Sequence, residues 1–228
     1  MPPVEIFIIA LPLAMVLALG IGSTVRIERR RRRATTGARE FATRHAWRYE
    51  EESEGLTESF ELPITASGRR RRLRSRNVLS GTYRSRAARS WEFSASERTR
   101  GSSRGRTRTY VNLYHLAALD AGQELPPLTI TARGGAISRA FAGVPSQTTG
   151  DAAFDRSWWS KAQNQGELRG LLGDALRARL LAFQGELDGL STRGSTLLVW
   201  RKGHQQAEDI EPLLEKAAEI LQHLERRG

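Results

Sequence analysis

An apolar stretch near the N-terminus constrains this chain more than any other feature. Residues 4–22 read VEIFIIALPLAMVLALGIG, and Glu5 is the only charged residue among them. A helix needs roughly 20 apolar residues to cross a hydrocarbon core about 30 Å thick, so the stretch is just long enough. Pro12 lies in mid-span, where membrane helices tolerate proline. The sequence therefore predicts one transmembrane helix within residues 1–25.

A cleaved signal peptide is the alternative, and the charges around the stretch argue against it. Signal peptides carry positive charge before their apolar run. Here the basic residues all follow the run, beginning with Arg26 and the arginines of the segment 26–35. Because positively charged flanks stay in the cytoplasm, we expect a single-pass protein of the cell membrane. Its N-terminus would lie outside and its C-terminal domain in the cytoplasm.

The whole chain has a net charge of +11, and its excess positive charge is concentrated in the first half. The arginine-rich juxtamembrane segment 26–35 needs no role beyond topology and anchoring, yet it would also attract anionic headgroups by about 1 kcal/mol per residue. A second basic cluster at 68–76 predicts an exposed, solvated loop, or else further contacts of the same kind. The candidate contacts with an anionic surface are Arg29, Arg30, Arg31, Arg32, Arg33, Arg69, Arg70, Arg71, Arg72, Arg74 and Arg76.

Residues 36–228 predict a cytoplasmic α+β domain, which could also divide into two lobes at about 36–135 and 150–228. Alternating apolar residues predict strands at 60–64, 77–83, 87–95, 109–117, 128–132, 187–191 and 195–201, and a less distinct one at 154–163. Helical spacing predicts helices at 36–47, at 167–183 and after Asp209. Polar stretches at 50–55, 96–108 and 133–151 predict turns and loops.

The order of these elements indicates the fold class. Strands come first and helices follow, instead of alternating as in a parallel α/β sheet. The fold class is therefore α+β: an N-terminal transmembrane helix, then an antiparallel sheet of meander and hairpins packed with about two to three helices.

No recognised catalytic or metal-binding motif occurs in the chain. It has no cysteine, which excludes disulfides, thiolate zinc sites and cysteine nucleophiles. None of its four histidines, His45, His115, His204 and His223, has the spacing of a metal-ligand pair. We therefore expect no cofactor, no metal and no enzymatic activity. An enzyme with an unrecognised site stays open as an alternative.

Nucleic-acid binding is a further alternative, because basic clusters at 69–76 and 98–108 flank strands that carry aromatic residues. Basic charge with interleaved aromatics is typical of surfaces that bind single strands. Here, however, Trp91 and Phe93 alternate with polar residues as core positions do, and no nucleic-acid-binding motif appears. Nucleic acid therefore ranks behind anionic lipid headgroups and an unidentified protein partner.

Six short segments carry a family resemblance: FATRHAWRY at 41–49, NVLSGTYRSR at 77–86, TRTYV at 107–111, LPPLTI at 125–130, FDRSW at 154–158 and STLLVWRKG at 195–203. In this order they resemble an uncharacterised actinobacterial family of membrane-anchored proteins with a domain of unknown function. Ala46 and Ser85 stand where such turns would hold glycine. The resemblance brings no activity or catalytic residue, so we expect a non-enzymatic, membrane-tethered interaction module.

Overall fold

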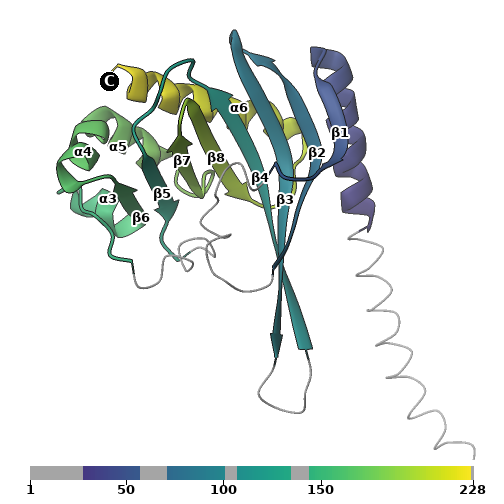
Figure 1. Cartoon of the computed structure of the whole chain (residues 1–228), viewed down its shortest axis with the longest axis horizontal. Helices are drawn as coiled ribbons and strands as arrows, with labels where there is room; N and C mark the ends of the chain where they lie inside the picture. Colours follow the sequence, from purple (N-terminus) through teal and green to yellow (C-terminus); the bar gives the residue numbers. More distant parts are fainter. Residues whose placement is uncertain (1–27, 57–70, 101–106, 135–143, 227–228) are drawn as a thin grey trace, which may run out of the picture.

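One antiparallel sheet organises the chain. The computed structural model describes residues 28–56, 71–100, 107–134 and 144–226. Its sheet has eight strands, and every neighbouring pair is antiparallel. Their order across the sheet (Figure 1) is β1 (Arg48–Ser53), β2 (Arg71–Tyr83), β3 (Arg86–Arg100), β4 (Thr107–Asp120), β8 (Thr196–Lys202), β7 (Gly189–Arg193), β5 (Leu128–Ala132) and β6 (Trp158–Ala162). The predicted α+β class with an antiparallel sheet is confirmed.

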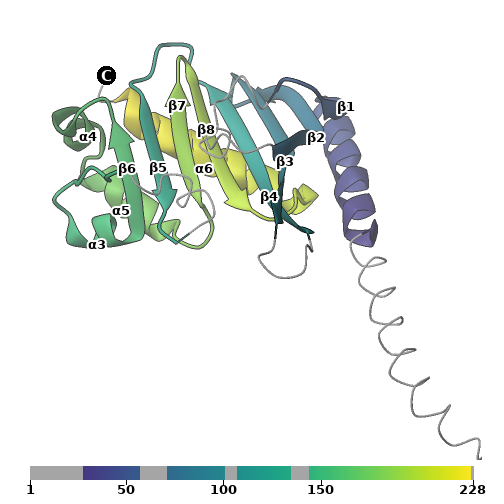
Figure 2. The same ribbon diagram turned by 60° about the horizontal axis from the view of Figure 1, so that its bottom comes forward.

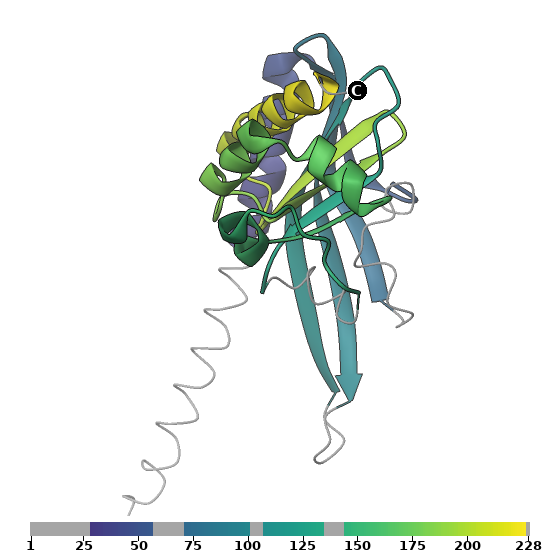
Figure 3. The same cartoon turned by 90° about the vertical axis from the view of Figure 1, so that its left-hand side faces the viewer.

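Five helices occur in the described part of the chain, more than the two to three expected. They are a helix over residues 28–45, α3 (Ala152–Ser157), α4 (Gln165–Leu171), α5 (Asp174–Ala182) and α6 (Ala207–Glu225). The helix over 28–45 and α6 lie on the same face of the sheet (Figures 2 and 3). Phe41 from the first helix, Leu214 from α6 and Leu119 from β4 belong to one buried apolar cluster. Burial of this cluster therefore holds both helices against the sheet.

Both faces of the sheet contain buried apolar clusters. The alternation of residues along each strand does not by itself reveal this. On β4, Ala117 and Leu119 belong to the cluster beneath the helices, while Leu116 and Ala118 belong to a second cluster. Successive side chains of a strand point to opposite faces, so the second cluster lies on the face away from the helices. Trp91, Phe93 and Trp200 are fully buried there.

Charged side chains fasten α6 to the turn between β2 and β3. The Tyr83 hydroxyl donates a hydrogen bond of 2.6 Å to the Glu215 carboxylate. Arg84 forms an ion pair of 2.6 Å with the same carboxylate. Burial, together with this carboxylate, raises the pKa of Tyr83 to about 12. The tyrosine therefore stays a hydrogen-bond donor at every physiological pH.

The prediction that the basic segments 68–76 and 96–108 form loops was partly wrong. Residues 71–76 of the cluster at 68–76 belong to strand β2, and residues 96–100 and 107–108 of the loop predicted at 96–108 extend β3 and β4. Arginine has weak strand preference, but cross-strand pairing overrides it here, since Arg74 pairs with Ser94 and Arg100 with Thr107. Tertiary pairing was therefore stronger than the local composition.

Local capping explains two further corrections. Residues 154–163 form α3 and then β6 instead of one strand, because Asp151 accepts hydrogen bonds from the backbone amides of Ala153 and Phe154 and starts a helix. The predicted helix 167–183 is divided into α4 and α5, because Leu172 and Gly173 leave helical geometry.

Helix α6 begins earlier than expected. Its first residue is Ala207, and Gln206 stands at the N-cap without a side-chain hydrogen bond. Asp209, predicted as the cap, lies inside the first turn, where its negative charge suits the helix dipole. The acidic stretch at 50–55 was also misassigned, since residues 50–53 belong to edge strand β1.

The predicted membrane anchor stays a prediction. Residues 4–22 and the strand expected at 60–64 lie outside the described residues. Within the part of the chain that the structure describes, none of the helices is both long and apolar enough to span a bilayer.

Ala46 ends the first helix in a strained conformation. Its φ is 55°, and the amide of Trp47 donates back to the carbonyl of Ala42 over 2.8 Å, the pattern of a helix C-cap that favours glycine. We expect Ala46→Gly to stabilise the protein by about 0.5–1 kcal/mol, measured as the urea midpoint of the full chain in detergent. Ala38→Gly, inside the same helix, is the control and should lower the midpoint. A loss of stability in Ala46→Gly would contradict the assignment.

Candidate functional site

The first arginine run lies on an exposed helix surface. Arg29, Arg30, Arg31, Arg32 and Arg33 occupy the beginning of the described helix 28–45, and all are exposed. Arg32 lies 3.1 Å from Glu28, but both side chains are largely solvated and such a pair contributes little to stability. The run therefore offers accessible positive charge next to the predicted anchor.

The described side chains of the second cluster lie beside an acidic residue of the neighbouring strand. Arg74 and Arg76 approach the carboxylate of Glu52 on β1, at 3.7 Å and 3.9 Å respectively. Of the remaining candidates, Arg71 and Arg72 belong to β2, while Arg69 and Arg70 lie outside the described residues. The part of this cluster whose side chains are described is thus partly neutralised by an acidic neighbour.

A buried polar cluster lies between the sheet and the N-terminal end of α6. The hydroxyl of Ser90 on β3 lies 2.9 Å from Nε2 of His115 on β4. It also accepts a hydrogen bond of 3.0 Å from the side-chain amide of Gln205. All three residues are at most 1% exposed. Burial, together with the positive charge of Arg201, lowers the pKa of His115 to about 3, so the ring is neutral.

A second histidine, His204, lies next to this buried polar cluster. Nδ1 of His204 lies 2.9 Å from the carboxylate of Glu92, which is itself buried. The hydrogen bond that the ring donates to the Glu92 carboxylate raises the pKa of His204, while burial and the charge of Arg30 oppose that shift. The ion pair between Arg201 and Asp209, at 2.9 Å, lies beside it. These contacts fix the segment between β8 and α6 to the sheet.

The serine–histidine pair resembles half of a catalytic triad, but its surroundings do not support catalysis. A nucleophilic serine needs a histidine base that a third group orients. Here Nδ1 of His115 finds no hydrogen-bond partner in the described part of the chain. Both Ser90 and His115 are fully buried, so no substrate reaches them in this conformation. The arrangement suits a structural role.

Sequence reasoning missed the polar cluster for a definable reason. Ser90 and Glu92 alternate with Trp91 and Phe93, which predicts a strand with one solvated face. The helices cover that face, so the alternating polar residues become buried polar partners. Polar residues on a covered face must find hydrogen bonds, but the sequence does not show which loop will supply them.

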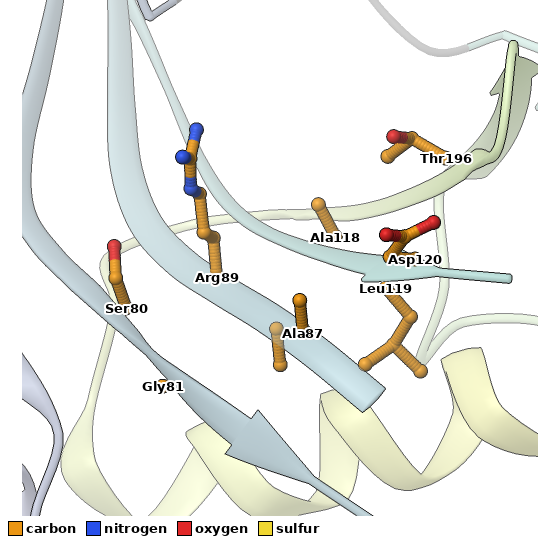
Figure 4. A pocket seen from close by; sticks show the side chains of 9 residues that line it. Ser80, Gly81, Ala87, Arg89, Ala118, Leu119, Asp120 and Thr196 are labelled. Atoms are coloured by element: carbon orange, nitrogen blue, oxygen red, sulfur yellow. The ribbon is translucent and has the colours of Figure 1, made fainter. Parts of the chain in front are cut away.

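A shallow basin lies on the face of the sheet away from α6 (Figure 4). Its volume is about 360 Å³, and small residues such as Gly81, Ala87 and Ala118 leave it open. Arg89 stands at its side, and no carboxylate pairs with it among the described residues. Asp120, also in the lining, is engaged by the amide of Gly122. With one free cation and no aromatic platform, the basin suggests no particular ligand.

Comparison with known proteins finds one solved structure with a similar fold. No protein-family model and no curated protein matches the chain. Among solved structures, the chain is similar to the mycobacterial trehalose monomycolate transport factor A, TtfA, with a TM-score of 0.54 and 12% sequence identity. The similarity covers 84% of this chain and 92% of the other. At this identity the comparison establishes a shared fold.

The family resemblance is confirmed in part. The structural neighbour is mycobacterial, hence actinobacterial, as the sequence motifs indicated. Membership of a membrane-anchored family with a domain of unknown function stays a prediction.

Proposed function

We propose that this chain is a single-pass membrane protein whose domain acts, without catalysis, in lipid transport. The observation that carries the proposal is the fold shared with TtfA over most of both chains, since that protein is named a transport factor for trehalose monomycolate. At 12% identity the lipid itself is not carried over. The role we transfer is the coarser one, a factor that assists the movement of a lipid.

Tethering to the membrane rests on the sequence and agrees with this role. Residues 4–22 have the length and apolarity of a transmembrane helix, and the arginines after them favour a cytoplasmic domain. A factor that assists lipid movement gains from being held at the bilayer, because tethering raises its effective concentration there.

A non-catalytic role is supported by the polar cluster. The serine–histidine pair is sealed from solvent, and the histidine of the second pair, His204, is held in an ion pair with Glu92. The domain is therefore better suited to binding a partner protein or a lipid surface than to chemistry.

Deletion and complementation in the native host test the proposal. We expect loss of the gene to change the distribution of lipids between the inner membrane and the outer envelope, measured by mass spectrometry of separated fractions. The full chain should restore the distribution. So should residues 26–228 behind an unrelated single-pass anchor, whereas the same residues without an anchor should not.

Two results would refute the proposal. An unchanged lipid distribution after deletion would remove the transport role. Full restoration by residues 26–228 without any anchor would contradict the proposal that the domain must be tethered to the membrane. Protease digestion of spheroplasts tests the orientation, because a cytoplasmic domain stays protected until the membrane is lysed.

A further inference from the structure

The hairpin of β3 and β4 extends as an arm from the sheet at one end of the molecule, and the outermost part of the arm is two-stranded. We define the arm as residues 94–100 of β3 paired with residues 107–113 of β4. Strand β8 pairs with β4 only from Tyr114 onward, and β2 pairs with β3 only as far as Glu97. The last three pairs of the arm therefore have no neighbouring strand among those described. Figures 1 and 3 show the arm projecting beyond the rest of the sheet.

The outer part of the arm is basic. Its last three pairs are Arg98 with Thr109, Thr99 with Arg108, and Arg100 with Thr107. These six residues include three arginines and no carboxylate, with Arg98 and Arg100 at register positions of one face of the ribbon and Arg108 at a position of the other. A projecting two-stranded ribbon buries little apolar surface, so packing stabilises it little and a bound partner would add to its stability.

The beginning of the first helix lies at the base of this arm. The amide of Gly203 donates to the carbonyl of Leu113 over 2.9 Å, which places the loop of His204 at the base. Arg30 is near enough to His204 for its charge to act on the ring. In Figures 1 and 3 the start of the helix over 28–45 and the arm lie at the same end of the molecule. The first residues of the described helix therefore lie on the side of the domain to which the arm points.

The arm is long enough to reach the bilayer surface. It contains seven residues from Leu113 to Thr107, and the six steps between them span about 20 Å at the rise of a β-strand. Five residues lie between the apolar stretch that ends at 22 and the described helix that starts at 28, and the six steps along them cover about 9 Å as a helix or about 20 Å when extended. The reach of the arm equals that of the segment when extended, so the length of the arm permits a contact with the headgroups.

We propose that the arm is a second membrane contact, whose basic tip binds the anionic phospholipid headgroups of the bilayer in which residues 4–22 are anchored. This inference rests on the anchor proposed above. With one fixed point at the anchor and another at the tip, the domain would be held in one orientation on the membrane. The basin and the opposite end of the sheet would then face away from the bilayer.

Fluorescence quenching in reconstituted vesicles tests the contact, and the absence of native cysteine makes single labels straightforward. The full chain carries a fluorophore at Thr99→Cys on the arm, or at Thr82→Cys near the opposite end of the sheet. Vesicles contain phosphatidylcholine alone or with phosphatidylglycerol, plus a lipid whose headgroup bears a nitroxide quencher. We expect strong quenching at position 99 with phosphatidylglycerol, weak quenching without it, and none at position 82.

Charge reversal provides the matched comparison. Arg98→Glu, Arg100→Glu and Arg108→Glu together should abolish quenching at position 99, and so should raising the salt concentration, which screens exposed charges. Arg89→Glu, an exposed arginine at the other end of the same strand, should leave it unchanged.

The outcomes distinguish failure of the proposed arm contact from failure of the proposed anchor. If the labelled chain does not float with the vesicles after an alkaline wash, the anchor fails and the arm contact fails with it. If the chain floats but position 99 is not quenched, or is quenched equally without phosphatidylglycerol, the arm proposal alone is overturned. A fluorescence change at position 99 only on adding a single-stranded oligonucleotide would likewise overturn it, in favour of nucleic-acid binding.

Discussion

Replacing Gly189 with alanine is expected to destabilise the protein by about 2–3 kcal/mol, an overpacking effect at a site that cannot relax. A Cβ at this position would lie 2.3 Å from Cζ2 of Trp200 and 2.6 Å from the carbonyl oxygen of Ile130. Trp200 is fully buried, and the carbonyl belongs to the neighbouring strand β5. Neither atom can move without disturbing the sheet between β5 and β8.

The measurement is the urea midpoint of the full chain in detergent, and Gly170→Ala is the matched control. Gly170 lies in helix α4, and a Cβ there would meet nothing within 4 Å. That variant should be stabilised by about 0.5–1 kcal/mol, because glycine inside a helix is unfavourable. Equal midpoints for the two variants would contradict the packing described around Trp200.

Much of the sheet could be predicted because its signals are local. The hairpin around residues 193–194 follows from alternating residues on either side of a glycine, and β5 has the predicted bounds of 128–132. The strands at 77–83, 87–95 and 109–117 were likewise found, although the true strands are longer. Apolar alternation marks only the part of a strand that packs in the core, so the basic extensions escaped notice.

Elements that depend on distant partners could not be predicted. Strand β1 carries Glu50, Glu51 and Glu52, a composition typical of a turn. It is a strand because it pairs with β2, at residues 22 to 32 positions further along the chain, and because Arg74 and Arg76 approach Glu52. The division between α4 and α5 depends on a departure from helical geometry at Leu172 and Gly173 that apolar spacing does not reveal.

The candidate surface was foreseen only in part. The sequence identified arginine runs, and the exposed run at residues 29–33 fits that reading. It did not show that Arg98, Arg100 and Arg108 lie together on a projecting ribbon, since those residues were expected in a loop. Three-dimensional pairing sets the direction in which the arm points, and the proposed membrane contact depends on that direction.

Acid should destabilise the protein through His115. This ring is fully buried with a pKa of about 3, whereas in the unfolded chain its pKa is about 6.5. Below pH 6.5 the unfolded state takes up a proton that the folded state refuses until about pH 3, so stability falls as the pH falls through that window. At about 1.4 kcal/mol per pH unit, the expected loss between pH 7 and pH 5 is about 2 kcal/mol.

His115→Gln isolates this contribution, because an amide can keep a hydrogen bond to Ser90 but does not titrate. We expect the free energy of unfolding of the variant, measured with urea at pH 7 and pH 5, to change by about 2 kcal/mol less than that of the original chain.

His204→Gln is the control with the opposite sign. The pKa of His204 is raised by Glu92, so its stabilising effect is present below pH 6.5 and is lost as the pH rises through the folded value. Identical pH dependence in His115→Gln and the original chain would mean that solvent reaches His115, which would reopen the serine–histidine pair as a candidate catalytic site.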